Sequence, residues 1–291
     1  MKASNSRRVF IRQVGLAASS VLVLPNLGCL VDDKKRIGIQ LYSLRDEFSK
    51  GVENVIAEVS KAGYSWVEGY GYSVKNGFWG LTPTQFKQLL DKYSLTSPSA
   101  HYEFSEWEKT GNEAILDAYI AAAKTLQQKY IVVPFINPQI FNSVESVKAF
   151  ADKLNKASKR LEKEGLKLAY HNHDFEFKQL GDKTAYEVLV ENTLPSIDFE
   201  LDLYWAVRAK QDVLKLFKTY KGRFALWHVK DMDKVNPQKN TEVGSGSINF
   251  ESFTKEAKLS GLKYPFVEQE NFDINPYESI KISAKRLQNI I

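Results

Sequence analysis

All four histidines of this chain lie at the C-terminal ends of short apolar runs typical of β-strands; they are His101, His171, His173 and His228. Two further runs end in carboxylates and carry Asp202, Glu268 and Glu270. Imidazole and carboxylate groups gathered at the ends of parallel strands can bind a divalent metal ion or act as acid and base. Random placement would scatter four histidines over helices and loops. The pattern therefore indicates an enzyme.

The best candidates for metal ligands are Asp202, His228 and Glu268, which end three consecutive predicted strands. The preceding strand ends in His171 and His173, which strand alternation directs to the same side. We expect His173, nearer the rim, to be the fourth ligand and His171 to be a base or a substrate contact, although these two roles could be exchanged. This donor set suits one Mn²⁺, Zn²⁺, Co²⁺ or Mg²⁺ ion, and its lack of thiolates disfavours a structural zinc site.

Two further charged residues share the sides of these strands. Lys230 lies two residues after His228, and Glu270 lies two residues after Glu268. Lys230 could bind substrate oxygens, act as acid or base after a lowering of its pKa, or form a salt bridge with Asp231 or Glu268. Glu270 is a second catalytic candidate, or a partner that orients a metal ligand.

Several aromatic residues could stack on a bound ligand or hydrogen-bond to it. The candidates are Tyr42, His101 and Trp205, together with Trp79 and Trp107. Most aromatic residues of such a chain pack in the core, so we expect about two of these five to contact a ligand. The run 244–247, Gly-Ser-Gly-Ser, could also offer backbone N–H groups to an anion, although such glycines commonly only turn a loop.

The elements that must position these residues alternate regularly. Stretches with helical spacing separate eight short apolar runs, at 37–42, 66–69, 96–101, 130–136, 166–171, 197–202, 224–229 and 265–268. Eight such alternations predict a (β/α)8 TIM barrel, with the C-terminal strand ends forming the active-site face. A doubly wound open sheet is the alternative, but it favours a glycine-rich turn after the first strand, and residues 40–45 contain no glycine. Residues 36–291 show no internal repeat or linker, which predicts a single domain.

The N-terminus, residues 1–29, has the pattern of an export signal. Arg7 and Arg8 resemble the twin-arginine consensus, and an apolar stretch follows at 14–24. Cys29 is the only cysteine and follows Asn-Leu-Gly, which resembles a relaxed lipoprotein cleavage box. We expect export to the periplasm or envelope, with a lipid anchor at Cys29; the alternative is an incidental cysteine. The net charge of +5 forms no basic stripe and does not indicate nucleic-acid binding.

Residues 36–291 resemble the sugar phosphate isomerase/epimerase group of xylose-isomerase-like barrels. The matching stretches are 170–177, 201–205, 227–232, 243–246 and 267–270. The resemblance implies one metal ion held by Glu, Asp, His and Glu, of which Asp202, His228 and Glu268 match three. Where epimerases carry the first glutamate, this chain has His171 and His173, as in the dehydratases of the group. Loss of that carboxylate disfavours two-base epimerisation and favours one-base chemistry such as β-elimination or hydration.

The metal site and the resemblance together predict a reaction class. A metal ion bound to a carbonyl and its neighbouring hydroxyl acidifies the adjacent C–H, which a nearby base can deprotonate. We expect action on a keto-sugar or a 3-keto-glycoside outside the cytoplasm, with a small carbohydrate as the partner. Alternatives are a true isomerase or epimerase of a free sugar, and an inactive barrel that binds carbohydrate. An abasic-site nuclease is disfavoured, because four histidines do not readily supply a multi-metal cluster. The sequence does not indicate an oligomeric state.

Overall fold

The computed structural model of the protein describes residues 35–291, which form one compact unit, Lys35–Ile291. The expected export signal and the lipid-anchor residue Cys29 lie outside the described residues. Within residues 35–291, no helix is long and apolar enough to cross a membrane.

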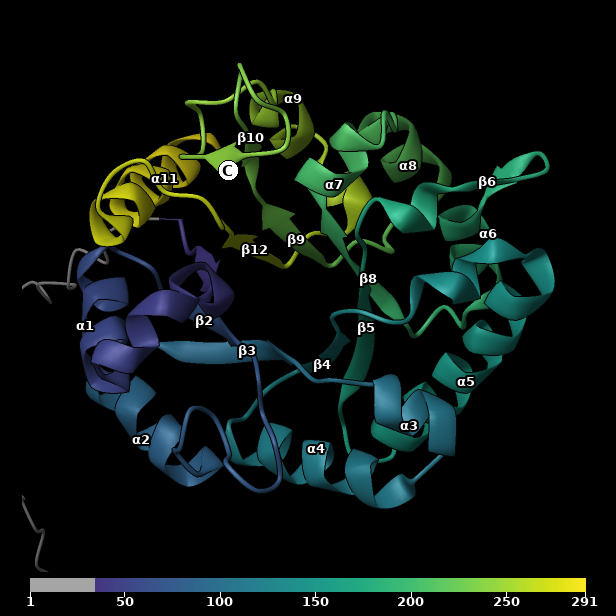
Figure 1. Ribbon diagram of the computed structural model, residues 1–291, viewed down its shortest axis with the longest axis horizontal. Helices are drawn as coiled ribbons and strands as arrows, with labels where there is room; N and C mark the ends of the chain where they lie inside the picture. Colours follow the sequence, from purple (N-terminus) through teal and green to yellow (C-terminus); the bar gives the residue numbers. More distant parts are fainter. Residues whose placement is uncertain (1–34) are drawn as a thin grey trace, which may run out of the picture. The chain divides into compact units, whose positions relative to one another are not determined.

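Eight parallel strands close into a barrel in the order β1-β12-β9-β8-β5-β4-β3-β2, which confirms the predicted TIM barrel (Figure 1). The strands are β1 (Gly38–Gln40), β2 (Trp66–Gly69), β3 (Thr96–His101), β4 (Tyr130–Val133), β5 (Lys167–His171), β8 (Asp198–Asp202), β9 (Leu226–Val229) and β12 (Tyr264–Val267). Closure excludes the open doubly wound sheet. Two short hairpins, β6 (Gln179–Leu180) with β7 (Lys183–Thr184) and β10 (Asp231–Met232) with β11 (Asn240–Thr241), lie outside the barrel sheet.

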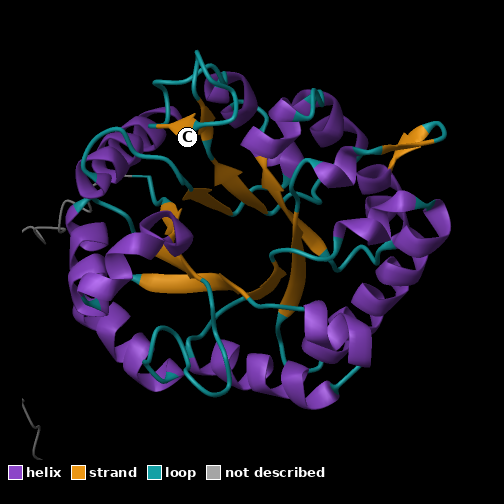
Figure 2. Ribbon diagram, viewed as in Figure 1, coloured by secondary structure: helices purple, strands orange, loops and turns teal. Residues whose placement is uncertain are grey.

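Helices surround the barrel as an outer ring (Figure 2). The α-helices are α1 (Val52–Lys61), α2 (Pro83–Lys92), α3 (Ser105–Thr110), α4 (Glu113–Thr125), α5 (Val144–Glu162), α6 (Ala185–Asn192), α7 (Leu203–Arg208), α8 (Val213–Thr219), α9 (Phe250–Thr254), α10 (Ala257–Ser260) and α11 (Pro276–Ile290). The 3₁₀ segments are η1 (Leu41–Lys50), η2 (Pro138–Asn142) and η3 (Phe175–Phe177). The larger apolar core consists of buried residues from the helices and strands.

The first strand is shorter than the predicted run 37–42. The side-chain oxygen of Gln40 accepts the backbone N–H of Tyr42 at 3.0 Å, and this cap starts η1 directly after β1. A side chain that satisfies a free backbone donor favours the start of a helical turn over continued strand. The change of element therefore brings Tyr42 to the rim of the barrel and leaves Gln40 buried within it.

Apolar and polar side chains occupy different levels of the barrel interior. A second buried cluster contains Val132, Ala169, Leu226 and Phe266, which come from strands β4, β5, β9 and β12. Strand alternation directs His228 to the same interior, two residues further along β9 than Leu226. Leu226, a member of this apolar cluster, therefore lies on the N-terminal side of His228 along β9.

The loop after β9 is organised around the carboxylate of Asp231. Its Oδ2 accepts the backbone N–H groups of Gly244 and Gly246 at 2.8 and 3.0 Å, and its Oδ1 accepts that of Ile248 at 3.1 Å. The run 244–247 therefore does bind an anionic group, but that group is a side chain of the same chain. This arrangement fixes the segment that follows Lys230.

The close approach at Gly246 generates a stability prediction. A Cβ at this position would lie 2.3 Å from Asp231 Oδ1 and from the carbonyl oxygen of Met232, both parts of the loop itself. We expect Gly246→Ala to lower the free energy of unfolding by about 1–3 kcal/mol, because the buried carboxylate loses backbone donors. Urea denaturation measures the change, with the exposed Ser245→Ala as the control. Equal stability of the two variants would show that the Asp231 contacts are dispensable.

Candidate metal centre and active site

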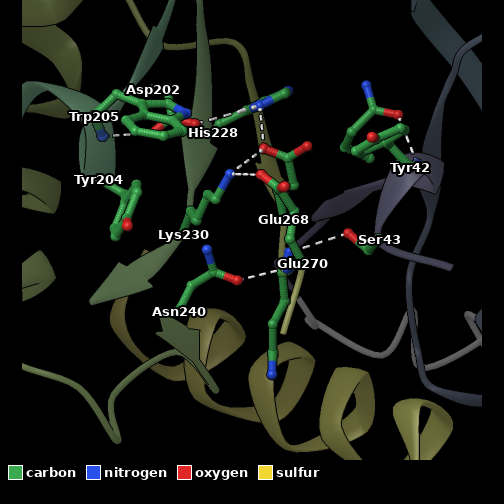
Figure 3. Close-up of polar contacts among 12 residues, drawn as sticks. Tyr42, Ser43, Asp202, Tyr204, Trp205, His228, Lys230, Asn240, Glu268 and Glu270 are labelled. Atoms are coloured by element: carbon green, nitrogen blue, oxygen red, sulfur yellow. Dashed lines mark hydrogen bonds and ion pairs between the residues drawn. The ribbon is translucent and has the colours of Figure 1, made fainter. Parts of the chain in front are cut away.

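Four side chains converge where strands β5, β8, β9 and β12 end, and they are His171, Asp202, His228 and Glu268. One ligand atom from each lies within 4.8 Å of all the others. Asp202 Oδ2 lies 3.6 Å from His171 Nε2 and 3.8 Å from His228 Nδ1. His228 Nδ1 lies 3.1 Å from Glu268 Oε2 (Figure 3). Ligands about 2.0–2.2 Å from a tetrahedral ion are about 3.3–3.6 Å from each other, so the spacing fits one bound cation.

Unpartnered atoms within the group support the same conclusion. Among the described residues, His171 Nε2 and Asp202 Oδ2 are buried and have no hydrogen-bond partner. The other ring nitrogen of His171, Nδ1, lies 3.1 Å from the carbonyl oxygen of Pro134. A carbonyl can only accept, so Nδ1 carries the proton and Nε2 presents a lone pair to the group. A bound cation would satisfy both atoms, and the site fits a divalent metal ion.

His173 lies beside this group and is not one of its four members. β5 ends at His171, so the chain has left the barrel wall when it reaches His173, and strand alternation no longer holds. The His173 ring stacks on Phe175 at 5.5 Å and contacts Trp205, and burial lowers its pKa to about 2. The geometry therefore favours His171 as the fourth ligand, which is the exchange of roles that the sequence left open.

A second polar group lies at the Nε2 edge of the His228 ring. It comprises Glu68, His101, Glu200 and His228 itself. His228 Nε2 lies 2.8 Å from Glu68 Oε2 and 3.2 Å from Glu200 Oε2. His101 Nε2 lies 2.8 Å from Glu200 Oε2 and 3.3 Å from Glu68 Oε2. The two separations of 2.8 Å are hydrogen-bond lengths, shorter than those between ligands of one ion. All four histidines of the chain thus meet, with ring centroids of neighbours about 5 Å apart.

The sequence analysis missed Glu68 and Glu200. A signal for Glu200 was present, because it lies two residues before Asp202 in the same strand and therefore faces the same side. Glu68 lies in the interior of a predicted strand, where a fully buried carboxylate is rare without a partner. Its partner Gln40 comes from the neighbouring strand β1, whereas His228 comes from β9, and only barrel closure brings His228 to it.

Charges in this second group compensate one another. Burial opposes the ionisation of Glu68, but the charge of His101 and hydrogen bonds from His101 and His228 outweigh it and lower its pKa. Burial and the charge of Glu68 raise the pKa of Glu200. Burial favours neutral His101, yet the two carboxylates raise its pKa to about 9. Ionised Glu68 therefore faces the protonated imidazole of His101, so neither buried charge is without a partner.

Lys230 is buried beside the metal-ligand group. Its Nζ lies 3.3 Å from Glu268 Oε2 and contacts Glu270, and it lies over the rings of Tyr204 and Trp205 (Figure 3). Burial favours the neutral amine, but Glu268, Asp202 and Glu270 raise the pKa of Lys230. Lys230 is thus a cation paired with two glutamates and not with Asp231, and the lowered pKa that a basic role requires is not observed.

A cavity of about 470 Å³ opens above these groups. Its polar lining includes His101, His171, His173, Lys230, Glu268 and Glu270. The expected substrate contacts Tyr42, His101 and Trp205 all line it. Tyr70 and Phe135, which the sequence analysis missed, complete its aromatic wall. Trp79 stacks instead on Phe48 at 4.2 Å, and Trp107 is buried against Phe104.

Comparisons with known proteins agree with this fold. A sugar phosphate isomerase/epimerase from Parabacteroides distasonis is similar with a TM-score of 0.77 and 26% identity, over 88% of this chain and 94% of that one. The probable 3-DHS dehydratase AsbF of Bacillus anthracis has a TM-score of 0.67 and 13% identity, over 88% and 99% of the chains. The IOLI protein, solved with a zinc atom, has a TM-score of 0.65 and 15% identity, over 88% and 98%. No curated protein matched the chain.

The family model described as "Xylose isomerase-like TIM barrel" matches residues 56–290, which is most of the chain and nearly all of the barrel. This match confirms the resemblance drawn from the motifs at the strand ends. The chain therefore belongs to the xylose isomerase-like TIM barrel family.

Proposed function

We propose that the protein is a metal-dependent enzyme that removes a proton next to the carbonyl of a keto-sugar or a 3-keto-glycoside. The observation that carries the proposal is the pair of unpartnered buried atoms, His171 Nε2 and Asp202 Oδ2, within a ligand-spaced group at the base of the cavity. Sugar isomerases, epimerases and a dehydratase among the relatives support carbohydrate as the substrate class.

The ligands in this proposal are His171, Asp202, His228 and Glu268. A divalent cation held there would supply Lewis acidity, which acidifies the C–H beside a carbonyl. Two of the four ligands are imidazoles, which add no negative charge, so the group carries less negative charge than a set with a glutamate on β5. A cation in this site keeps more of its positive charge for the substrate oxygens, and this favours ionisation of the substrate.

Proton transfer is assigned to Glu270, which lines the cavity and is not a member of the ligand group. Its carboxylate can accept the proton from carbon, and Lys230 holds it by an ion pair. The Lys230 ammonium can also donate to a substrate oxygen that gains negative charge. His171 occupies the position where a second carboxylate would be needed for epimerisation. The set therefore favours β-elimination of a glycosidic substituent, or hydration, over exchange of a proton between two bases.

Metal binding tests the ligand assignment. We expect the purified protein to bind about one Zn²⁺ or Mn²⁺ per chain, measured by elemental analysis after gel filtration. His171→Ala should weaken Zn²⁺ binding by at least about 100-fold, because a ligand matters more than the outer partners, which contribute about 10–100-fold. His173→Ala is the matched control and should retain the metal. The opposite result for the two variants would reassign the fourth ligand to His173.

Solvent exchange tests the reaction class. With the metal-loaded enzyme and a 3-keto-glucoside in D₂O, we expect release of the aglycone with loss of the hydrogen beside the carbonyl, and deuterium at that carbon once D₂O adds to the double bond, all read by mass spectrometry. Glu270→Gln should lower kcat by about 10²–10⁴-fold while the metal content stays constant. A product that retains every substrate hydrogen would contradict proton abstraction. Turnover of free ketoses without attack on the glycoside would assign an isomerase instead, and tight binding without any turnover would assign a binding protein.

We also propose that the protein is exported and anchored by lipid at Cys29, on the strength of the twin-arginine pattern and the cleavage-box pattern alone. Growth of producing cells with a labelled fatty acid should label the wild-type protein and not Cys29→Ser. Label on both proteins, or on neither, would contradict anchoring at this residue.

A further inference from the structure

His228 is engaged through both ring nitrogens. Its Nδ1 belongs to the metal-ligand group, and its Nε2 lies 2.8 Å from Glu68 Oε2 on the other side of the ring. We propose that Glu68 is the positioning residue of the metal centre, which holds His228 as the Nε2–H tautomer with the Nδ1 lone pair directed at the cation. This inference rests on the proposed metal site and assigns a function to a residue of β2.

The hydrogen-bond direction follows from the residues on the far side of Glu68. Gln40 Oε1 accepts the backbone N–H of Tyr42, so the amide group of Gln40 must point its Nε2 at Glu68 Oε2, at 2.9 Å. An amide N–H can only donate, so this carboxylate oxygen is an acceptor. His228 Nε2 therefore carries the proton that it shares with the same oxygen. A neutral ring with its proton on Nε2 has its lone pair on Nδ1, the atom that lies 3.1 Å from Glu268 Oε2 within the ligand group.

Glu200 is the competing candidate for this role, and the distances favour Glu68. Glu200 Oε2 lies 3.2 Å from His228 Nε2, and its nearest imidazole is that of His101, at 2.8 Å. Glu68 Oε2 also accepts from Gln40 Nε2, a contact that Glu200 lacks, while Oε1 of both carboxylates has no partner among the described residues. The hydrogen-bonded series Tyr42–Gln40–Glu68–His228 thus links the cavity wall at the start of η1 to the ligand group.

The two imidazole ligands are held by acceptors of different strength. His171 donates from Nδ1 to the neutral carbonyl of Pro134, and His228 donates from Nε2 to a carboxylate. A carboxylate partner orients a ligating imidazole and raises its basicity, and its loss typically lowers metal affinity about 10–100-fold. Glu68 is fully buried, so water cannot replace it as the acceptor. Of the two histidines, His228 should therefore depend more on its outer partner.

Zn²⁺ titration calorimetry on the full chain tests the assignment with four proteins. Glu68→Met keeps the approximate volume but removes the acceptor, and we expect Zn²⁺ affinity to fall about 10–100-fold. Glu68→Gln retains an acceptor oxygen and should restore most of that loss. Glu200→Met removes a neighbouring buried carboxylate and is the matched control, with a smaller loss than Glu68→Met. Equal losses in Glu68→Met and Glu200→Met, or wild-type affinity in Glu68→Met, would overturn the proposal.

Imidazole ¹⁵N spectra of the Zn²⁺-loaded wild type test the tautomer without any substitution, and the four histidines of the chain keep the spectrum simple. We expect His228 to show a protonated Nε2 and a metal-shifted Nδ1. An unprotonated Nε2 would overturn the proposal, as would a second bound Zn²⁺ that Glu68→Gln removes, because Glu68 would then be a ligand. Failure of the wild type to bind any metal would instead refute the proposed function.

Discussion

His228 connects two groups of buried polar side chains, and the closure of the barrel makes this connection possible. His228 lies on β9, and the neighbours of β9 in the sheet are β8 and β12. These two strands supply Asp202 and Glu268 at the rim. Glu68 reaches the same ring from β2, which lies three strands from β9 around the closed barrel, through β12 and β1. In an open sheet these strands would not face one another across an interior. The site therefore depends on the closed topology more than on any one loop.

Burial determines the charge states around this ring. Inside the barrel water is excluded, so each carboxylate is stable only if an imidazole, an amide or an ammonium group contacts it. Each of the two groups keeps two buried atoms without a hydrogen-bond partner among the described residues: Glu68 Oε1 and Glu200 Oε1 in one, His171 Nε2 and Asp202 Oδ2 in the other. The second pair differs because its two atoms lie 3.6 Å apart, at the spacing of two ligands of one ion.

The rim is organised by contacts that are local in space and distant in sequence. Asp231 binds the backbone of its own loop, and Lys230, the preceding residue, points the other way toward Glu268 and Glu270. The two side chains contact different partners, so adjacent residues serve loop structure and chemistry independently. The aromatic wall of Tyr42, Tyr70, Phe135 and Trp205 surrounds this cation and the imidazoles with surfaces suited to the face of a sugar ring.

The sequence by itself determined the strand count, the barrel and the rim position of Asp202, His228 and Glu268. These features depend on alternation and on residue types at strand ends, which are local properties of the chain. It also narrowed the fourth ligand to two histidines, but the choice between them depends on where β5 ends and on the Pro134 carbonyl, which lies beyond the end of β4. Only the tertiary structure revealed the role of Glu68, because that role depends on its hydrogen-bond partners. These partners are Gln40 and His228, which are 28 and 160 residues away in the sequence. Local pattern decides which side of a strand a residue faces, whereas barrel closure decides what it meets there.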